Sequence, residues 1–147
     1  MKTPPRAWVR ILRTAGVAGA ATVILLWGFV MFFENRLIYF PSREGDGKAL
    51  QRLSIPHEEV EFRASDGVKL HGWFAPNPAA EFTILYFHGN AGNLCDRADW
   101  VAALFHLPAS VFIIDYRGYG KSEGVPSEAG LYLDGEAAYR WLVETRH

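Results

Sequence analysis

The sequence predicts an α/β domain that follows one membrane-spanning helix. Three observations support this fold class: an uncharged apolar run near the amino terminus, an Asp-Gly turn between two strand-like segments, and two continuous apolar runs that are each followed by a helical pattern. Strands that alternate with helices indicate a parallel sheet with helices packed on its faces. The predicted order in the domain is therefore hairpin, strand, helix, strand, helix.

The apolar run at residues 15–33 contains no charged residue. At about 1.5 Å per residue, a helix of this length crosses the roughly 30 Å hydrocarbon core of a bilayer. A cleaved signal peptide is disfavoured because Met31, Phe32 and Phe33 stand where a small-residue cleavage site is needed. A buried soluble helix would be shorter or carry a polar stripe. We therefore expect an uncleaved signal anchor.

Basic residues lie on both sides of this run. Four precede it and four follow it, namely Lys2, Arg6, Arg10, Arg13, Arg36, Arg43, Lys48 and Arg52. The tighter cluster before the run favours a cytoplasmic amino terminus. We expect a single-pass membrane protein whose globular part lies on the non-cytoplasmic side. The predicted segments are a basic amino-terminal segment (1–14), the anchor (15–33), a connector (34–56) and the α/β domain (57–147).

The strands of the domain follow from turn and apolar signals. Asp66-Gly67 separates "HEEVEFRAS" from "VKLHGWFAP", which predicts an antiparallel hairpin because Gly accepts positive φ. The runs "FTILYFHG" (82–89) and "SVFIIDY" (110–116) are typical of strands that are covered on both faces.

Each apolar run precedes a predicted helix. The first helix has Asn93 as the expected N-cap and Pro108 behind it, and its apolar face holds Leu94, Ala98, Val101 and Phe105. The second helix opens at Pro126-Ser127-Glu128, and its face holds Leu131, Gly135, Ala138 and Leu142.

Composition excludes several classes of function. With 15 basic and 16 acidic side chains, the net charge of −1 gives no reason to expect a nucleic-acid partner. His57, His71 and His106 are isolated and His147 is the last residue, so neither a metal site nor a cofactor is expected. Cys95 cannot form an internal disulfide. It is either a thiol activated by a helix amino terminus or a small packed side chain, and we expect the second.

Ser122 lies in a literal G-x-S-x-G, Gly120 to Gly124. This pattern spells the nucleophile elbow of serine hydrolases, in which the Ser joins a strand directly to a helix. Here the strand ends near Tyr116, and Pro126 biases Val125 away from the α region before a helix can start. We therefore expect Ser122 to bond to nearby backbone in a Gly-rich loop and not to act as a nucleophile.

The stretch "YFHGNAGN" runs from a strand through a Gly-containing loop towards a helix amino terminus. Backbone N–H groups and the helix dipole converge there, which suits a phosphate cradle or an oxyanion hole. The cradle is disfavoured because no G-K-[ST] follows this loop and its Gly spacing is not G-x-G-x-x-G.

The stretches "FHGNAGN", "IDYRGYGKSEG" and "YRWL" resemble the amino-terminal half of an α/β-hydrolase. The similarity extends from Leu37 to Trp141 and is greatest to single-span, membrane-anchored serine hydrolases, in which "RLIYFPS" also follows the anchor. The resemblance implies the first strands of the hydrolase sheet: an antiparallel hairpin, then parallel strands with helices.

The resemblance also implies roles for individual residues. Asn90 would donate its N–H to an oxyanion, with Ala91 as the second candidate. The same loop would be supported by His88 and Gly89, although His88 has the general base as its alternative role. A structural loop would be formed by Asp115, Arg117, Gly118, Gly120 and Ser122.

Two further expectations concern acidic residues of this half. An ion pair or loop anchor would join Asp115 and Arg117, and Asp134 and Glu136 would lie on a half-solvated helix and not serve as the triad acid.

The resemblance places the nucleophile, the acid and the base His beyond residue 147, so no catalytic residue is expected within the chain, and we expect it to be inactive alone. It implies a parent enzyme that cleaves ester, thioester or amide bonds through an acyl-enzyme. Its substrate would be a small-molecule or lipid-like acyl compound. Two alternatives are a non-catalytic, membrane-tethered binding or scaffolding domain and a truncated reading frame without function.

Overall fold

The computed structural model of the chain describes residues 6–45 and 47–146. The predictions for Lys2 and His147 lie outside the described residues, as does position 46 of the predicted connector. The chain divides into two compact units, which meet between Leu37 and Ile38.

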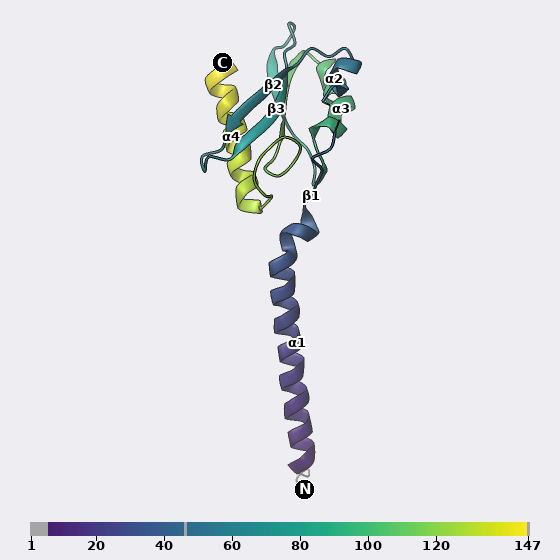
Figure 1. Ribbon diagram of the computed structural model, residues 1–147, viewed down its shortest axis with the longest axis vertical. Helices are drawn as coiled ribbons and strands as arrows, with labels where there is room; N and C mark the ends of the chain where they lie inside the picture. The colour runs from purple at the N-terminus through teal and green to yellow at the C-terminus, as the bar shows by residue number, and fades with distance from the viewer. Residues whose placement is uncertain (1–5, 46, 147) are drawn as a thin grey trace. The chain divides into compact units, whose positions relative to one another are not determined.

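Helix α1 (Arg6–Ile38), apart from its last residue, makes up the described part of the first unit (Figure 1). It extends beyond residues 15–33 at both ends, because no proline lies between Arg6 and Ile38. Within Ala7–Ile38, an 18-residue window has a mean hydropathy of 2.1, so the length and composition of this stretch suffice to cross a membrane. Signal sequences share these properties, so α1 is a candidate span.

The second unit is built on a mixed sheet with the strand order β2-β3-β6-β4. The hairpin strands β2 (Glu58–Arg63) and β3 (Lys69–Ala75) are antiparallel, as predicted. Strand β6 (Ala109–Asp115) pairs antiparallel to β3 and parallel to β4 (Phe82–Phe87). The predicted α/β fold class is confirmed. The carboxyl ends of β4 and β6 therefore meet at one edge of the sheet.

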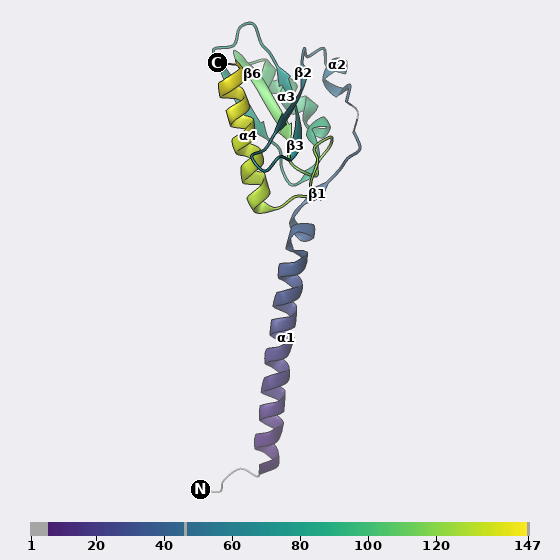
Figure 2. The same cartoon turned by 60° about the vertical axis from the view of Figure 1, so that its left-hand side comes forward.

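Helices cover both faces of this sheet (Figure 2). The 3₁₀ helix η1 (Leu94–Arg97) and α3 (Ala98–Phe105) pack on one face, and α4 (Glu128–Arg146) packs on the other. Strand β6 supplies both cores because its side chains alternate. Val111 and Ile113 lie in the α3 core, and Phe112 and Ile114 lie in the α4 core.

Part of the segment predicted as a connector is packed into the second unit. Helix α2 (Ala49–Arg52) buries Leu50 completely, and Ile55 joins the same core. Upstream, β1 (Phe40–Pro41) pairs in parallel with β5 (Ala91–Gly92). Strand β1, helix α2 and Ile55 therefore belong to the packed part of the second unit.

The helix starts agree with their sequence signals, but one helix face does not. Asn93 caps η1 through its side chain, which accepts a hydrogen bond from the N–H of Cys95, as predicted. On α4, however, the buried positions are Gly130, Asp134, Ala137 and Ala138. Helix α4 is half-solvated, as predicted, and Asp134 lies on its buried side, where the carboxylate is paired with Arg117.

Candidate functional site

The loop from His88 to Ala91 follows the carboxyl end of β4, and hydrogen bonds hold two of its carbonyl groups. The Gly89 carbonyl oxygen lies 2.7 Å from His88 Nδ1, which donates to it. The Asn90 carbonyl accepts from Tyr119 Oη at 2.6 Å and from the Phe40 N–H at 2.9 Å. Both oxygens are therefore oriented by neighbouring groups.

These bonds also orient the two N–H groups that the sequence singles out. In a trans peptide unit the carbonyl and the following N–H point in opposite directions. Fixing the carbonyl of Gly89 therefore directs the N–H of Asn90 away from His88. Fixing the carbonyl of Asn90 directs the N–H of Ala91 away from Tyr119. Both Asn90 and Ala91 are exposed, so a reacting group can approach them.

Asp115 lies at the centre of the polar groups behind this loop. It is buried, and its Oδ1 accepts a 2.8 Å hydrogen bond from the N–H of Leu94. His71 Nδ1 lies 3.6 Å from Oδ2, and His88 Nε2 lies 3.7 Å from Oδ1. Burial acts to raise the pKa of Asp115, but the two histidines and the Leu94 N–H outweigh it and hold this pKa below its ordinary value.

Gly120 is required beside Asp115. Its φ is +46°, and a Cβ at this position would collide with the carboxylate of Asp115. Gly118 also has positive φ, and a Cβ there would lie 2.6 Å from Cδ of Pro126. Both glycines thus shape the loop that follows β6.

The expected pair of Asp115 with Arg117 does not form. Arg117 instead donates to Asp134, from its own N–H at 2.8 Å and from Nη2 at 2.8 Å. Its Nη1 donates to Asp66 at 2.8 Å. These bonds, with Asp134 as the main cause, raise the pKa of Arg117. The choice among three nearby carboxylates depends on tertiary positions that the local sequence does not encode.

Ser122 is completely buried, and its hydroxyl is engaged with the backbone. Its Oγ donates to the Asp115 carbonyl at 2.6 Å and accepts from the His71 N–H at 2.9 Å. The preceding strand ends at Asp115 and α4 begins at Glu128, so Ser122 does not join a strand to a helix. This geometry is unlike that of a nucleophile elbow.

Cys95 lies in the first turn of η1 and is half-buried. Burial, assisted by the charges of Asp115 and Asp96, raises its pKa to about 11. The thiol is therefore protonated near neutral pH, which makes it a poor nucleophile.

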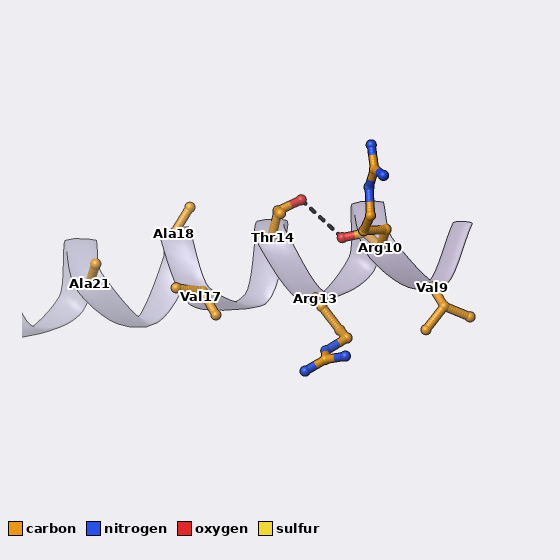
Figure 3. A pocket seen from close by; sticks show the side chains of 7 residues that line it. All are labelled: Val9, Arg10, Arg13, Thr14, Val17, Ala18 and Ala21. Atoms are coloured by element: carbon orange, nitrogen blue, oxygen red, sulfur yellow. Dashed lines mark hydrogen bonds between the residues drawn. The ribbon is translucent and has the colours of Figure 1, made fainter. Parts of the chain in front are cut away.

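Two other parts of the described chain offer no better site. A polar cavity of about 70 Å³ lies among His71, Trp73, Asn93 and Asp115, which is room for ordered water but not for an acyl chain. A hollow on α1 is lined by one helix alone, with Arg10 and Arg13 directed to different sides (Figure 3). Among the described residues, no group of three or more metal-ligating side chains is placed to hold an ion.

Tyr119 and Phe40 are the residues of this site that the sequence reasoning missed. Tyr119 belongs to the quoted "DYRGYG" stretch, and a buried tyrosine in a glycine-rich loop needs a partner for its hydroxyl. That signal was available. Phe40 contributes a backbone N–H from a two-residue strand, which no side-chain pattern reveals.

Comparison with known proteins supports the fold described above. No protein-family model matches the chain. Protein bem46 of Schizosaccharomyces pombe is 38% identical over 144 residues, which is 91% of this chain and 48% of that protein. The alpha/beta hydrolase domain-containing protein WAV2 of Arabidopsis thaliana is 38% identical over 130 residues, which is 83% of this chain and 40% of that protein. The chain thus spans less than half the length of these relatives.

Solved structures show the same arrangement of strands and helices. The Pyrococcus furiosus esterase Pf2001 superposes with a TM-score of 0.62 at 24% identity, over 74% of this chain and 42% of the esterase. An alpha-beta hydrolase of Vibrio vulnificus gives a TM-score of 0.57 at 20% identity, over 71% of this chain and 38% of that structure. At these identities the likeness concerns the fold alone.

Proposed function

The chain is related in sequence and in fold to the α/β-hydrolases, and from this premise we propose that it is the membrane-anchored, amino-terminal part of a serine hydrolase. The observation that carries the proposal is the His88–Ala91 loop, where hydrogen bonds to two successive carbonyls orient the N–H groups of Asn90 and Ala91. In acyl transfer the carbonyl oxygen of the substrate becomes an oxyanion, and oriented N–H donors stabilise it.

In this proposal each residue of the loop has a separate task. Asn90 and Ala91 donate their N–H groups to the oxyanion. His88 and Tyr119 do not touch the substrate and act as positioning residues, because each holds the carbonyl that precedes one donor. Asp115 supports His88 from behind. The reaction class is the cleavage of an ester, thioester or amide through an acyl-enzyme.

The nucleophile, acid and base of this reaction would lie in sequence that follows residue 147. Two observations favour this arrangement. The matched part makes up less than half of the length of these relatives. In addition, β4 is the last strand of the described sheet, and Phe82 and Phe87 at its ends remain exposed. In the α/β-hydrolase fold a further strand would pair there and carry the nucleophile.

Helix α1 would serve as an uncleaved anchor with the second unit on the non-cytoplasmic side. Its length and mean hydropathy support a crossing, and Met31, Phe32 and Phe33 disfavour cleavage. The test is carbonate washing of membranes followed by amino-terminal sequencing. We expect the protein in the pellet with its original amino terminus. Recovery in the soluble fraction, or a mature terminus near residue 34, would exclude the anchor.

The catalytic proposal is tested by removing one donor from the backbone. The DNA that follows codon 147 is sequenced first, and the protein encoded with its continuation is assayed on a short p-nitrophenyl ester. Ala91→Pro deletes the N–H of residue 91 and should lower kcat by about 10²–10³-fold with little change in KM. The matched control is Ala129→Pro, because the first turn of α4 tolerates proline.

Each outcome of this comparison is informative. A large loss in Ala91→Pro with near-normal activity in Ala129→Pro supports the assigned donor. Full activity in Ala91→Pro contradicts it. A continuation that lacks G-x-S-x-G between a strand and a helix, and lacks a following Asp and His, contradicts the enzyme as a whole.

A further inference from the structure

The first strand of the second unit is hydrogen-bonded to the candidate functional site. Ile38 is the last residue of α1, and Phe40 follows two positions later as the first residue of β1. The N–H of Phe40 donates to the carbonyl of Asn90, and the N–H of Ser42 donates to the carbonyl of Gly92 at 3.0 Å. The attachment point of this unit is therefore a strand that pairs with the candidate oxyanion loop.

Chain length limits how far this loop can lie from the end of the helix. Two residues of extended chain span at most about 7 Å. If α1 crosses a bilayer and ends at its interface, Phe40 must lie within that reach of the interface, and Asn90 is hydrogen-bonded to Phe40. The limit comes from covalent connection alone and holds for any angle between the helix and the domain.

Exposed aromatic side chains flank the same loop. Phe87 directly precedes His88 at the end of β4 and is 40% exposed, although one face of its ring stacks on Tyr116 at a centroid distance of 5.8 Å. Phe40, across the β1–β5 pair, is 59% exposed. Uncovered aromatic area of this kind favours contact with an apolar ligand, since each ring removed from water contributes to binding.

We propose that this site takes its substrate from the bilayer: an amphiphilic acyl ester or thioester whose tail lies against Phe40 and Phe87 while its carbonyl reaches the N–H groups of Asn90 and Ala91. This inference rests on the proposed function, because it assigns a substrate class to the same site. The two observations that carry it are independent of each other. One is the attachment of the unit through β1, and the other is the exposure of the two rings.

The test uses the full chain in phosphatidylcholine vesicles whose acyl chains carry a diazirine. After illumination, cross-linked residues are mapped by mass spectrometry. Phe87 is the informative position, because it is far from α1 in sequence. Trp100 on α3 is the internal control, since it is an exposed aromatic residue (64%) outside the loop. We expect several-fold more label on Phe87 than on Trp100.

Two variants distinguish a specific lipid contact at the loop from nonspecific labelling of exposed aromatic side chains. The double variant Phe40→Ser and Phe87→Ser should lose most labelling of the β4 end, whereas Trp100→Ser should leave it unchanged. If Trp100 in the unaltered chain is labelled as strongly as Phe87 or more strongly, the inference is overturned. This comparison does not depend on whether any variant folds. Labelling needs no catalysis, so persistent label at Phe87 together with full activity of the Ala91→Pro protein would reject the proposed function and leave a lipid-binding surface.

Discussion

Replacing Asp134 should destabilise the packing of α4 on the sheet, because this buried carboxylate accepts hydrogen bonds from the guanidinium and the backbone N–H of Arg117. The carboxylate receives donors from Arg117 N, Nε and Nη2, at 2.8, 3.0 and 2.8 Å. Both partners are buried, with 0% of Asp134 and 7% of Arg117 exposed. Removing one member of a buried ion pair costs about 3–5 kcal/mol. Arg117 keeps its contact with Asp66, so we expect the lower end, about 3 kcal/mol, for Asp134→Ala.

Hydrogen exchange of the full chain in detergent micelles measures this loss where it occurs. A loss of about 3 kcal/mol accelerates exchange of the α4 amides by about 100-fold, since each 1.4 kcal/mol is tenfold. Asp134→Asn keeps one acceptor oxygen and should lose less. The matched control is Glu136→Ala, which breaks an exposed pair with Arg140 on the same helix and should change exchange by about twofold. Equal effects of Asp134→Ala and Glu136→Ala would refute the reasoning.

Three further predictions concern Asp115, Cys95 and the β4 edge. Because the pKa of Asp115 is held below 3.8, its stabilising contribution is present above that pH and is lost as the pH falls through the folded-state pKa. The free energy of unfolding of Asp115→Asn should therefore not show this loss at acid pH. A dependence on pH identical to that of the unaltered protein would contradict the prediction. With a pKa of about 11 in place of 9.0, Cys95 should react with iodoacetamide at pH 8 about 100-fold more slowly than in urea; equal rates would be inconsistent with burial. Residues 37–147 expressed without the anchor should self-associate, because β4 is the last strand of the described sheet. A monodisperse monomer in sedimentation, with protected amides from Ile84 to Phe87, would disprove this.

Local signals were sufficient for most of the elements. The Asp66-Gly67 turn marks the hairpin, and the cap at Asn93 marks the start of η1, because both depend on residues close together in sequence. The run at β6 also behaves as expected, with every residue buried. Strand β4 is only partly covered, with Phe82 and Phe87 exposed, although its sequence pattern is that of a strand covered on both faces. The pattern reports what a strand can bury, not what lies beside it.

The parts of the site that were missed depend on contacts between distant residues. The partner of Arg117 is Asp134, 17 positions away on α4. Asp134 is buried, although its charge suggests a position on the solvent-exposed side of the helix. Strand β1 has two residues, too few for any periodicity, yet it supplies the N–H that holds Asn90. By contrast, Ser122 could be rejected as an elbow from two local features, the end of the preceding strand near Tyr116 and the position of Pro126.

The most direct test of the central proposal is fluorophosphonate labelling of the protein in its native membranes, followed by peptide mapping. The proposal places the oxyanion donors at Asn90 and Ala91 and the nucleophile beyond residue 147. It predicts that Ser122 remains unlabelled, because its hydroxyl is buried between two backbone partners. Any label should map to a serine that follows residue 147. Labelling of Ser122 that disappears in Ser122→Ala would contradict the proposal.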